Sequence, residues 1–192
     1  MNTNDSLEVK NNRAKIMMLW FGMISMSMTF AGLTSAYVVS SSRSDWIQQI
    51  ELPFAFTLST LLIIFSSGSF YGALKMIQSQ KIKAAQGLLM LTLAIAIGFI
   101  YFQFQGFAAI IDQGYYFTGP ESSITTSYLY VLVLLHLLHL TAGIVIVLNV
   151  FFKTLKGKYL DGNTLGFELA VTFWHFLDLL WVYLFLFVSF YG

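Results

Sequence analysis

Five long apolar stretches constrain the fold of this chain more than any other feature of its sequence. A helix rises 1.5 Å per residue, so about 20 apolar residues are needed to cross roughly 30 Å of hydrocarbon. The two-residue alternation that is typical of membrane barrel strands is absent. The sequence therefore predicts an all-α integral membrane protein, a bundle of five transmembrane helices at Ile16–Ser40, Pro53–Ile77, Ala84–Ile111, Ile124–Phe152 and Leu165–Tyr191.

Composition supports this class and narrows the partners. Hydrophobic residues make up 57% of the chain and charged residues 10%, against roughly 25% charged in a soluble domain. A net charge of +1 gives no basic face for nucleic acid, so no nucleic-acid partner is expected. There are no cysteines, which excludes disulfides and thiolate metal sites. We expect a single membrane domain at residues 16–192, preceded by a polar, poorly ordered tail at residues 1–15.

The basic residues indicate how the helices are oriented. Of the ten Lys and Arg residues, only Arg43 falls on the opposite side of the predicted membrane from the others. Cytoplasmic loops carry an excess of Lys and Arg, so the sequence predicts a cytoplasmic N-terminus and a C-terminus on the periplasmic or outer side. The residues on the predicted cytoplasmic side are Lys10, Arg13, Lys15, Lys75, Lys81, Lys83, Lys153, Lys156 and Lys158.

Small residues mark a helix face in the second predicted span. Gly68 and Gly72 are four apart and so lie on the same side of a helix. Such small-xxx-small faces let helix backbones approach closely in lipid, where hydrophobic burial gives little drive for association. We expect this face to pack inside the bundle rather than to form a partner interface.

Ionisable and tryptophan side chains gather in the last two spans. Ionisable groups inside a membrane are costly and need partners, so they are candidates for function. The fourth span has two histidines three residues apart, and the fifth has one polar stripe flanked by tryptophans. These candidate residues are His136, His139, Glu168, Trp174, His175, Asp178 and Trp181.

The histidines of the fourth span and the polar residues of the fifth are predicted to lie at a similar depth in the membrane. His139 and Asp178 each lie about thirteen residues from the loop that joins the last two spans, or roughly 20 Å at the helical rise. The two spans form a hairpin, so His136 and His139 are expected to meet His175 and Asp178 between the helices. Glu168 is expected nearer the inner surface, hydrated or in contact with a lipid head group.

Four interpretations of this group remain open from the residues alone. A structural polar latch between two helices is the one we favour. A proton relay, a metal or haem site, and lipid head-group binding at the ends of the stripe are the others. The chain has no glycine-rich phosphate loop, no His-Glu-x-x-His and no Gly-x-Ser-x-Gly. No catalytic, cofactor-binding or metal-binding residue is therefore predicted.

The last span also carries a motif that points to a family. The run Phe173-Trp174-His175-Phe176-Leu177-Asp178-Leu179-Leu180-Trp181 resembles the final helix of haem–copper (cytochrome c) oxidase subunit III. His136 and His139, followed by Ala142-Gly143, are similar to the His-x-x-His-x-x-x-Gly of its preceding helix. Phe30-Ala31-Gly32 through Tyr37, then Pro53, Thr57 and Ser66-Ser67, are similar to its earlier helices. The chain resembles the short, five-helix bacterial form. Met26 stands where many relatives have a buried glutamate, so a role of that carboxylate does not transfer.

The resemblance implies a function that the residues alone do not reach. It implies an accessory, non-catalytic subunit of a respiratory terminal oxidase in the bacterial inner membrane, with cytochrome c oxidase as the first expectation. Its implied roles are to stabilise catalytic subunit I, bind structural phospholipid and support proton uptake. Haems and copper are expected in partner subunits and no cofactor in this chain, with further respiratory subunits as partners and a supercomplex left open. The alternatives are the equivalent subunit of a quinol oxidase or nitric oxide reductase, a free-standing proton-coupled transporter, and a membrane cytochrome.

Overall fold

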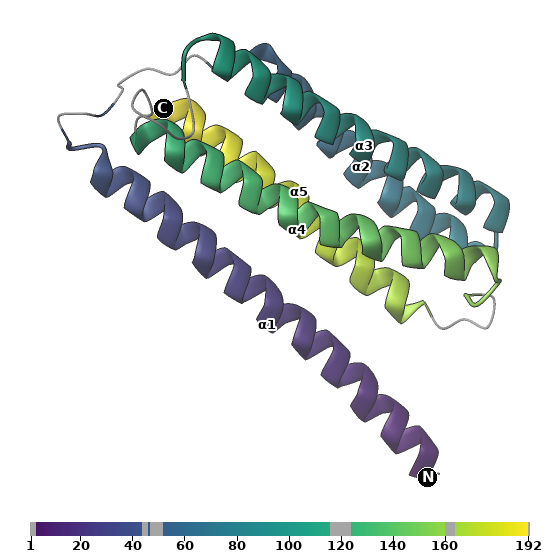
Figure 1. The fold of residues 1–192 in the computed structure, drawn as a ribbon. Helices are drawn as coiled ribbons and strands as arrows, with labels where there is room; N and C mark the ends of the chain where they lie inside the picture. Colours follow the sequence, from purple (N-terminus) through teal and green to yellow (C-terminus); the bar gives the residue numbers. More distant parts are fainter. Residues whose placement is uncertain (1–2, 44–45, 47–51, 116–123, 160–163, 192) are drawn as a thin grey trace.

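A computed structural model describes residues 3–43, 46, 52–115, 124–159 and 164–191 (Figure 1). Within these residues five α-helices follow one another, and each is long and apolar enough to cross a membrane, which confirms the predicted class. The last helix begins and ends at the predicted residues, α1 begins thirteen residues before its predicted start at Ile16, and the ends of the other helices agree with the predicted ones to within a few residues. The helices are α1 (Thr3–Ser40), α2 (Phe54–Gln78), α3 (Ile82–Asp112), α4 (Ile124–Leu155) and α5 (Leu165–Tyr191).

The predicted poorly ordered tail is instead part of α1. The helix begins at Thr3 and continues without a break through residues 3–15 into the apolar span. Neither Gly nor Pro occurs between Thr3 and Lys15. Extending an existing helix costs far less than starting one, because the unfavourable nucleation step has already been made in the membrane span. The polarity of these residues did not indicate their backbone conformation.

Tight turns set the order in which the helices pack. The α2–α3 link is three residues long, and Gln80 takes the left-handed conformation with φ of 60°. The backbone N–H of Lys81 then donates to the Met76 carbonyl at 2.9 Å. Gly157, with φ of 68°, ends α4 in the same way, where a residue with a Cβ is disfavoured. The first turn folds α3 back antiparallel along α2, and the second ends α4 abruptly.

Helices α2 to α5 form a four-helix bundle, and α1 lies along one side of it (Figure 1). Helix α1 packs against α5 and α4, through buried residues such as Phe30, Thr34 and Tyr37. Its N-terminal half extends away from the bundle (Figure 1), and Met17, Met18 and Phe21 are more than half exposed. Helix α1 therefore adds only a few residues, such as Met23, to the bundle core and is held mainly by the half that leads to Ser40.

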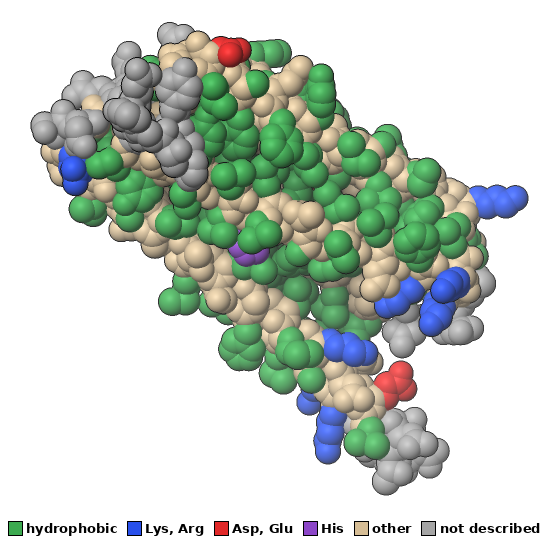
Figure 2. All heavy atoms as spheres, in the orientation of Figure 1, with side chains coloured by type: hydrophobic (Ala, Val, Ile, Leu, Met, Phe, Trp, Pro, Cys, Tyr) green, Lys and Arg blue, Asp and Glu red, His purple; other side chains and the backbone are tan. Residues whose placement is uncertain are grey.

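The surface matches a protein that lies in lipid. Figure 2 shows apolar side chains over the length of the helices, while most of the visible Lys and Arg side chains gather at the end that holds the N-terminus. Lys75 lies in the last turn of α2 and Lys153 in the last turn of α4, both at that end. Apolar side chains exposed along the helices include Phe65, Ile97 and Leu179. The molecule is a multi-span membrane protein.

Candidate functional site

The two tryptophans of α5 are anchored on α2. Trp174 and Trp181 are seven residues apart, two turns of helix, so both face the bundle core, and both are 98% or more buried. The Trp174 indole N–H donates to Ser66 Oγ at 3.0 Å, and that of Trp181 donates to Thr60 Oγ1 at 2.9 Å. A buried indole N–H needs an acceptor, and hydroxyls on α2 supply both.

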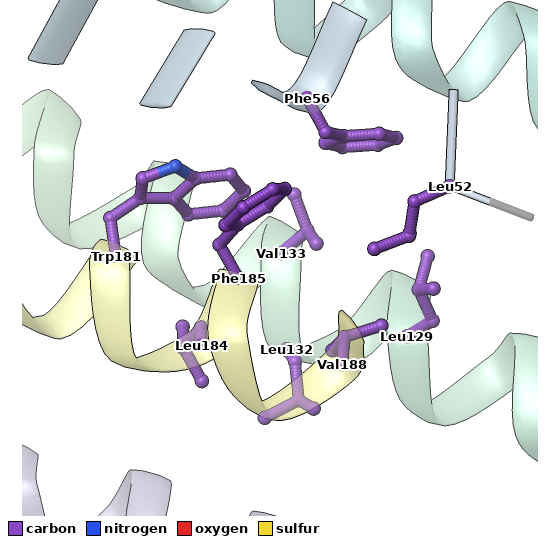
Figure 3. Close-up of a pocket in the computed structure, with 9 residues that line it drawn as sticks. All are labelled: Leu52, Phe56, Leu129, Leu132, Val133, Trp181, Leu184, Phe185 and Val188. Carbon is purple, nitrogen blue, oxygen red and sulfur yellow. The ribbon is translucent and has the colours of Figure 1, made fainter. Parts of the chain in front are cut away.

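Aromatic rings surround Trp181 on three sides. Its ring centre lies 5.2 Å from that of Phe99 on α3, edge to face, and 5.1 Å from that of His136 on α4. Phe56 of α2 stacks at 6.5 Å. Figure 3 shows Phe56 facing Trp181 and Phe185 across an apolar pocket between α2, α4 and α5. Trp181 is thus the point at which all four bundle helices meet.

His136 behaves as one of these rings. Its side chain is fully buried, and neither ring nitrogen has a hydrogen-bond partner among the residues that the structure describes. Phe99 and Trp181 flank it. An imidazolium without a partner in an apolar core would carry a large desolvation cost, so the arrangement suits a neutral imidazole. His136 fills the centre of the bundle rather than lining a path to the surface.

His139 has different neighbours from His136. Its Nδ1 lies 2.8 Å from the Leu135 carbonyl oxygen of its own helix. A carbonyl only accepts, so the hydrogen must be on Nδ1. The imidazole ring meets Phe30 of α1 edge-on at 5.7 Å. His139 therefore connects α4 to α1.

His175 and Asp178 turn toward α2. His175 Nδ1 is hydrogen bonded to the hydroxyl of Ser67, and its ring lies 6.2 Å from that of Tyr71. Asp178 is 4% exposed, and neither of its carboxyl oxygens has a hydrogen-bond partner in the described part of the chain. Ser67, His175 and Asp178 line one groove between the two helices.

The predicted meeting of the two polar groups between α4 and α5 is corrected by these contacts. Depth was estimated by counting along each helix, but rotation about the helix axis decides which face meets a neighbour. On α5 the face toward α4 is occupied by Trp174 and Leu177, which lie against Gly143. A Cβ at Gly143 would come within 2.8 Å of the Leu177 side chain. His175 and Asp178 are consequently directed to α2, while His136 and His139 have separate neighbours.

Glu168 stands apart from the mid-membrane residues. It lies in the first turn of α5 and accepts a hydrogen bond from Thr164 Oγ1 at 2.8 Å. A carboxylate at a helix N-terminus is favoured by the helix dipole. Within the described ranges, no three His, Asp or Glu side chains gather in a way that could hold a metal ion. The predicted polar stripe is therefore two separate features, a helix cap and a groove.

The two glycines of α2 face different surroundings. A Cβ at Gly72 would lie 3.3 Å from Leu88 of α3, which is close interhelical packing. A Cβ at Gly68 would meet nothing within 4 Å, and Gly68 is exposed. The expected internal packing face thus includes Gly72 but not Gly68, which is exposed on the surface of α2.

Comparison with known proteins identifies the family. The model of the family "Cytochrome c oxidase subunit III" matches residues 44–192, which include α2 to α5 and both α5 tryptophans. The chain belongs to the cytochrome c oxidase subunit III family. The motif in α5 and the histidines of α4, which suggested this resemblance, all lie inside the matched region.

Individual relatives of this subunit III chain come from two kinds of oxidase. A cytochrome bo(3) ubiquinol oxidase subunit 3 of Pseudomonas putida is 30% identical over 82% of the chain and 72% of its own length. One from Buchnera aphidicola of Acyrthosiphon pisum is 25% identical over 98% of the chain and 92% of its own length. A cytochrome c oxidase subunit 3 of Bacillus sp. PS3 is 26% identical over 95% and 86%. The Buchnera alignment thus extends through most of α1.

Sequence reasoning missed the hydroxyl partners that α2 supplies to this subunit III core. Thr60, Ser66 and Ser67 bind Trp181, Trp174 and His175 respectively. Ser59 of the same helix accepts from Gln103 Nε2 of α3 at 2.9 Å. A signal was present, because these hydroxyls recur in pairs about seven residues apart, at the same spacing as the two tryptophans. Matching those two spacings would have paired α2 with α5.

Proposed function

We propose that this chain is the accessory, non-catalytic subunit III of a bacterial respiratory haem–copper terminal oxidase. The observation that carries the proposal is the family match over residues 44–192. In this account the chain assembles with the catalytic subunit, stabilises it, binds structural phospholipid and supports proton uptake during oxygen reduction. Haems and copper belong to the partner subunits. The broad exposed apolar surface, seen in Figure 2, supports a location in the membrane and contact with other membrane-embedded chains.

The placement of the histidines supports a non-catalytic role. A membrane cytochrome would need histidines directed at a shared cofactor. His136 is enclosed by rings, His139 is bound to its own helix backbone, and His175 is bound to Ser67. A transporter is supported less well, because α2 to α5 are each continuous, without the broken helices that many transporters use at their binding sites.

Affinity purification of the tagged chain from its native membranes tests the proposal. Haem–copper oxidase subunits are expected to co-purify, and mass spectrometry of the preparation would identify the donor-binding subunit. If a cytochrome c-binding subunit co-purifies, the complex is a cytochrome c oxidase. If that subunit is absent and subunit I oxidises quinol, the complex is a quinol oxidase. Recovery of the chain without any haem–copper subunit would contradict the proposal.

The orientation is part of the same proposal and has its own test. We propose a cytoplasmic N-terminus and a periplasmic or outer C-terminus in the bacterial inner membrane, supported by the Lys and Arg residues at one end of the bundle (Figure 2). Alkaline phosphatase, which is active only outside the cytoplasm, is expected to be active when fused after Gly192 and inactive after Lys156. The reverse pattern of activity would contradict this topology.

A further inference from the structure

A polar groove lies between α2 and α5, on the surface of the bundle. Ser67 and His175 face each other across it, and Asp178 lies at its base. The groove is open to the outside, and apolar side chains form the rest of its wall. We call this the α2–α5 groove; its lining residues are Ile64, Ser67, His175, Asp178, Leu179 and Val182.

The groove contains a carboxyl group whose hydrogen-bonding capacity is not met. Asp178 is 96% buried, and both of its oxygens lack a partner within the described residues. Ser67 lies close enough to this carboxyl to interact with it, but its hydroxyl is hydrogen bonded to His175 Nδ1, and no bond from Ser67 to Asp178 has normal hydrogen-bond geometry. A buried polar group that is left unpaired is costly, and more so in hydrocarbon than in water. Such an exception calls for a group that is missing from the isolated chain.

Hydrogen-bond direction determines what kind of group is missing. His175 is partly exposed, and Nε2 is the ring nitrogen left for a group outside the chain. If an outside donor binds Nε2, the ring hydrogen sits on Nδ1 and is donated to Ser67 Oγ. The Ser67 hydroxyl hydrogen is then no longer used by His175 and can be donated to the neighbouring Asp178. An outside acceptor would reverse the chain, and an ionised Asp178 would then be left without a donor.

The depth of the groove excludes lipid head groups as that donor. Asp178 is thirteen residues from each end of α5, or about 20 Å at the helical rise. The polar donors of phospholipids stay at the membrane surface, and acyl chains offer no donor. A side chain on another transmembrane helix reaches this depth.

The surface around the groove allows a helix to approach. Leu179 is 71% exposed, and Gly68 beside Ser67 has nothing within 4 Å of an added Cβ. Ile64 and Tyr71 complete an apolar rim on α2. Small residues next to a polar side chain are the usual composition of close helix contacts in membranes.

We propose that a transmembrane helix of the catalytic oxidase subunit docks in the α2–α5 groove and donates a hydrogen bond to His175 Nε2. The bond sets the direction of the His175–Ser67–Asp178 chain and so satisfies the buried carboxyl. This inference rests on the proposed function, because that function supplies the partner subunit. It adds the face, the residue and the donor chemistry of the contact.

Photo-crosslinking in the intact oxidase tests the face. Benzoylphenylalanine replaces Leu179 in the groove or, as a matched control, Ile97 on α3, which is 65% exposed and also at mid-helix. The probe at Leu179 is expected to yield an adduct with the catalytic subunit, and the probe at Ile97 only lipid or detergent adducts. Adducts at Leu179 with lipid alone, or with a second copy of this chain, would overturn the proposal. Co-purification of haem–copper subunits in the same sample shows that the proposed function itself has not failed.

Substitution of His175 tests the chemistry. His175→Phe keeps a ring beside Tyr71 and removes both nitrogens, so it should reduce the fraction of the chain retained in the purified oxidase. We expect retention to fall by about three-fold to twenty-fold, which corresponds to the average and the largest free energies of interhelical hydrogen bonds in membranes. His175→Gln, which keeps an acceptor, should recover part of it. His139→Phe, the same change on α4, should leave retention unchanged. Equal retention of His175→Phe and the wild-type chain, or an equal loss with His139→Phe, would contradict a donor contact at this groove.

Discussion

Replacing Trp181 with alanine is expected to lower the free energy of unfolding of the detergent-solubilised chain by about 3 kcal/mol. Trp181 is 2% exposed and packs against Phe56, Phe99 and His136, one residue from each of the other bundle helices. Removing a buried Trp from a soluble protein costs about 3–5 kcal/mol. The lower end applies here, because in lipid the exposed state of the side chain is already apolar and mainly the packing is lost.

Two further substitutions serve as comparisons. One separates the loss of packing from the loss of the hydrogen bond, and the other shows the effect of removing a tryptophan that is not in the core. Trp181→Phe keeps a ring but loses the bond to Thr60, so it should cost about 1 kcal/mol. Trp20→Ala removes a tryptophan of α1 that is 56% exposed and should leave the free energy unchanged. SDS titration followed by the remaining tryptophan fluorescence measures all three. Similar losses for Trp20→Ala and Trp181→Ala would show that the α5 tryptophan is not a packing centre.

Gly143→Leu is expected to separate α4 from α5 and to destabilise the chain by about 2–3 kcal/mol. The α4 backbone at Gly143 lies against α5, and even a Cβ there would come within 2.8 Å of Leu177 and 3.3 Å of the Trp174 ring. Leucine adds three further carbons. Leu177 is fully buried and Trp174 is 1% exposed, so neither side chain can swing into open space.

Gly87→Leu is the matched control for this change. Gly87 lies in α3, is exposed and has nothing within 4 Å of an added Cβ. Both substitutions gain the same helix propensity, which favours leucine over glycine by somewhat less than 1 kcal/mol. The difference between their SDS unfolding curves therefore reports the α4–α5 contact alone. Equal stability of the two variants would contradict the close approach at Gly143.

The number of helices was predictable because it depends only on length and apolarity. All five predicted spans are helices that could cross a membrane, and α5 was placed at its observed ends. The helical conformation of residues 3–15 was not predictable, because the polarity of a segment does not indicate whether a neighbouring helix continues through it.

The contacts of the polar residues were less predictable, because residue counting gives depth but not rotation. The sequence placed His139 and Asp178 at similar depth, yet they face α1 and α2 respectively. The rotation of α5 is set by the large rings of Trp174 and Trp181 together with the small Gly143. Such complementarity between distant positions is visible only once the helices are assembled.

The absorbance spectrum of the purified chain tests the central claim most directly. The tagged chain is isolated from its native membranes and also after expression in a host that lacks the other oxidase subunits. Haem bands are expected in the first preparation, because the catalytic subunit accompanies the chain, and none in the second, because His136, His139 and His175 have separate neighbours. Haem absorbance from the chain expressed alone, or its absence from the native preparation, would contradict the account of an accessory subunit III.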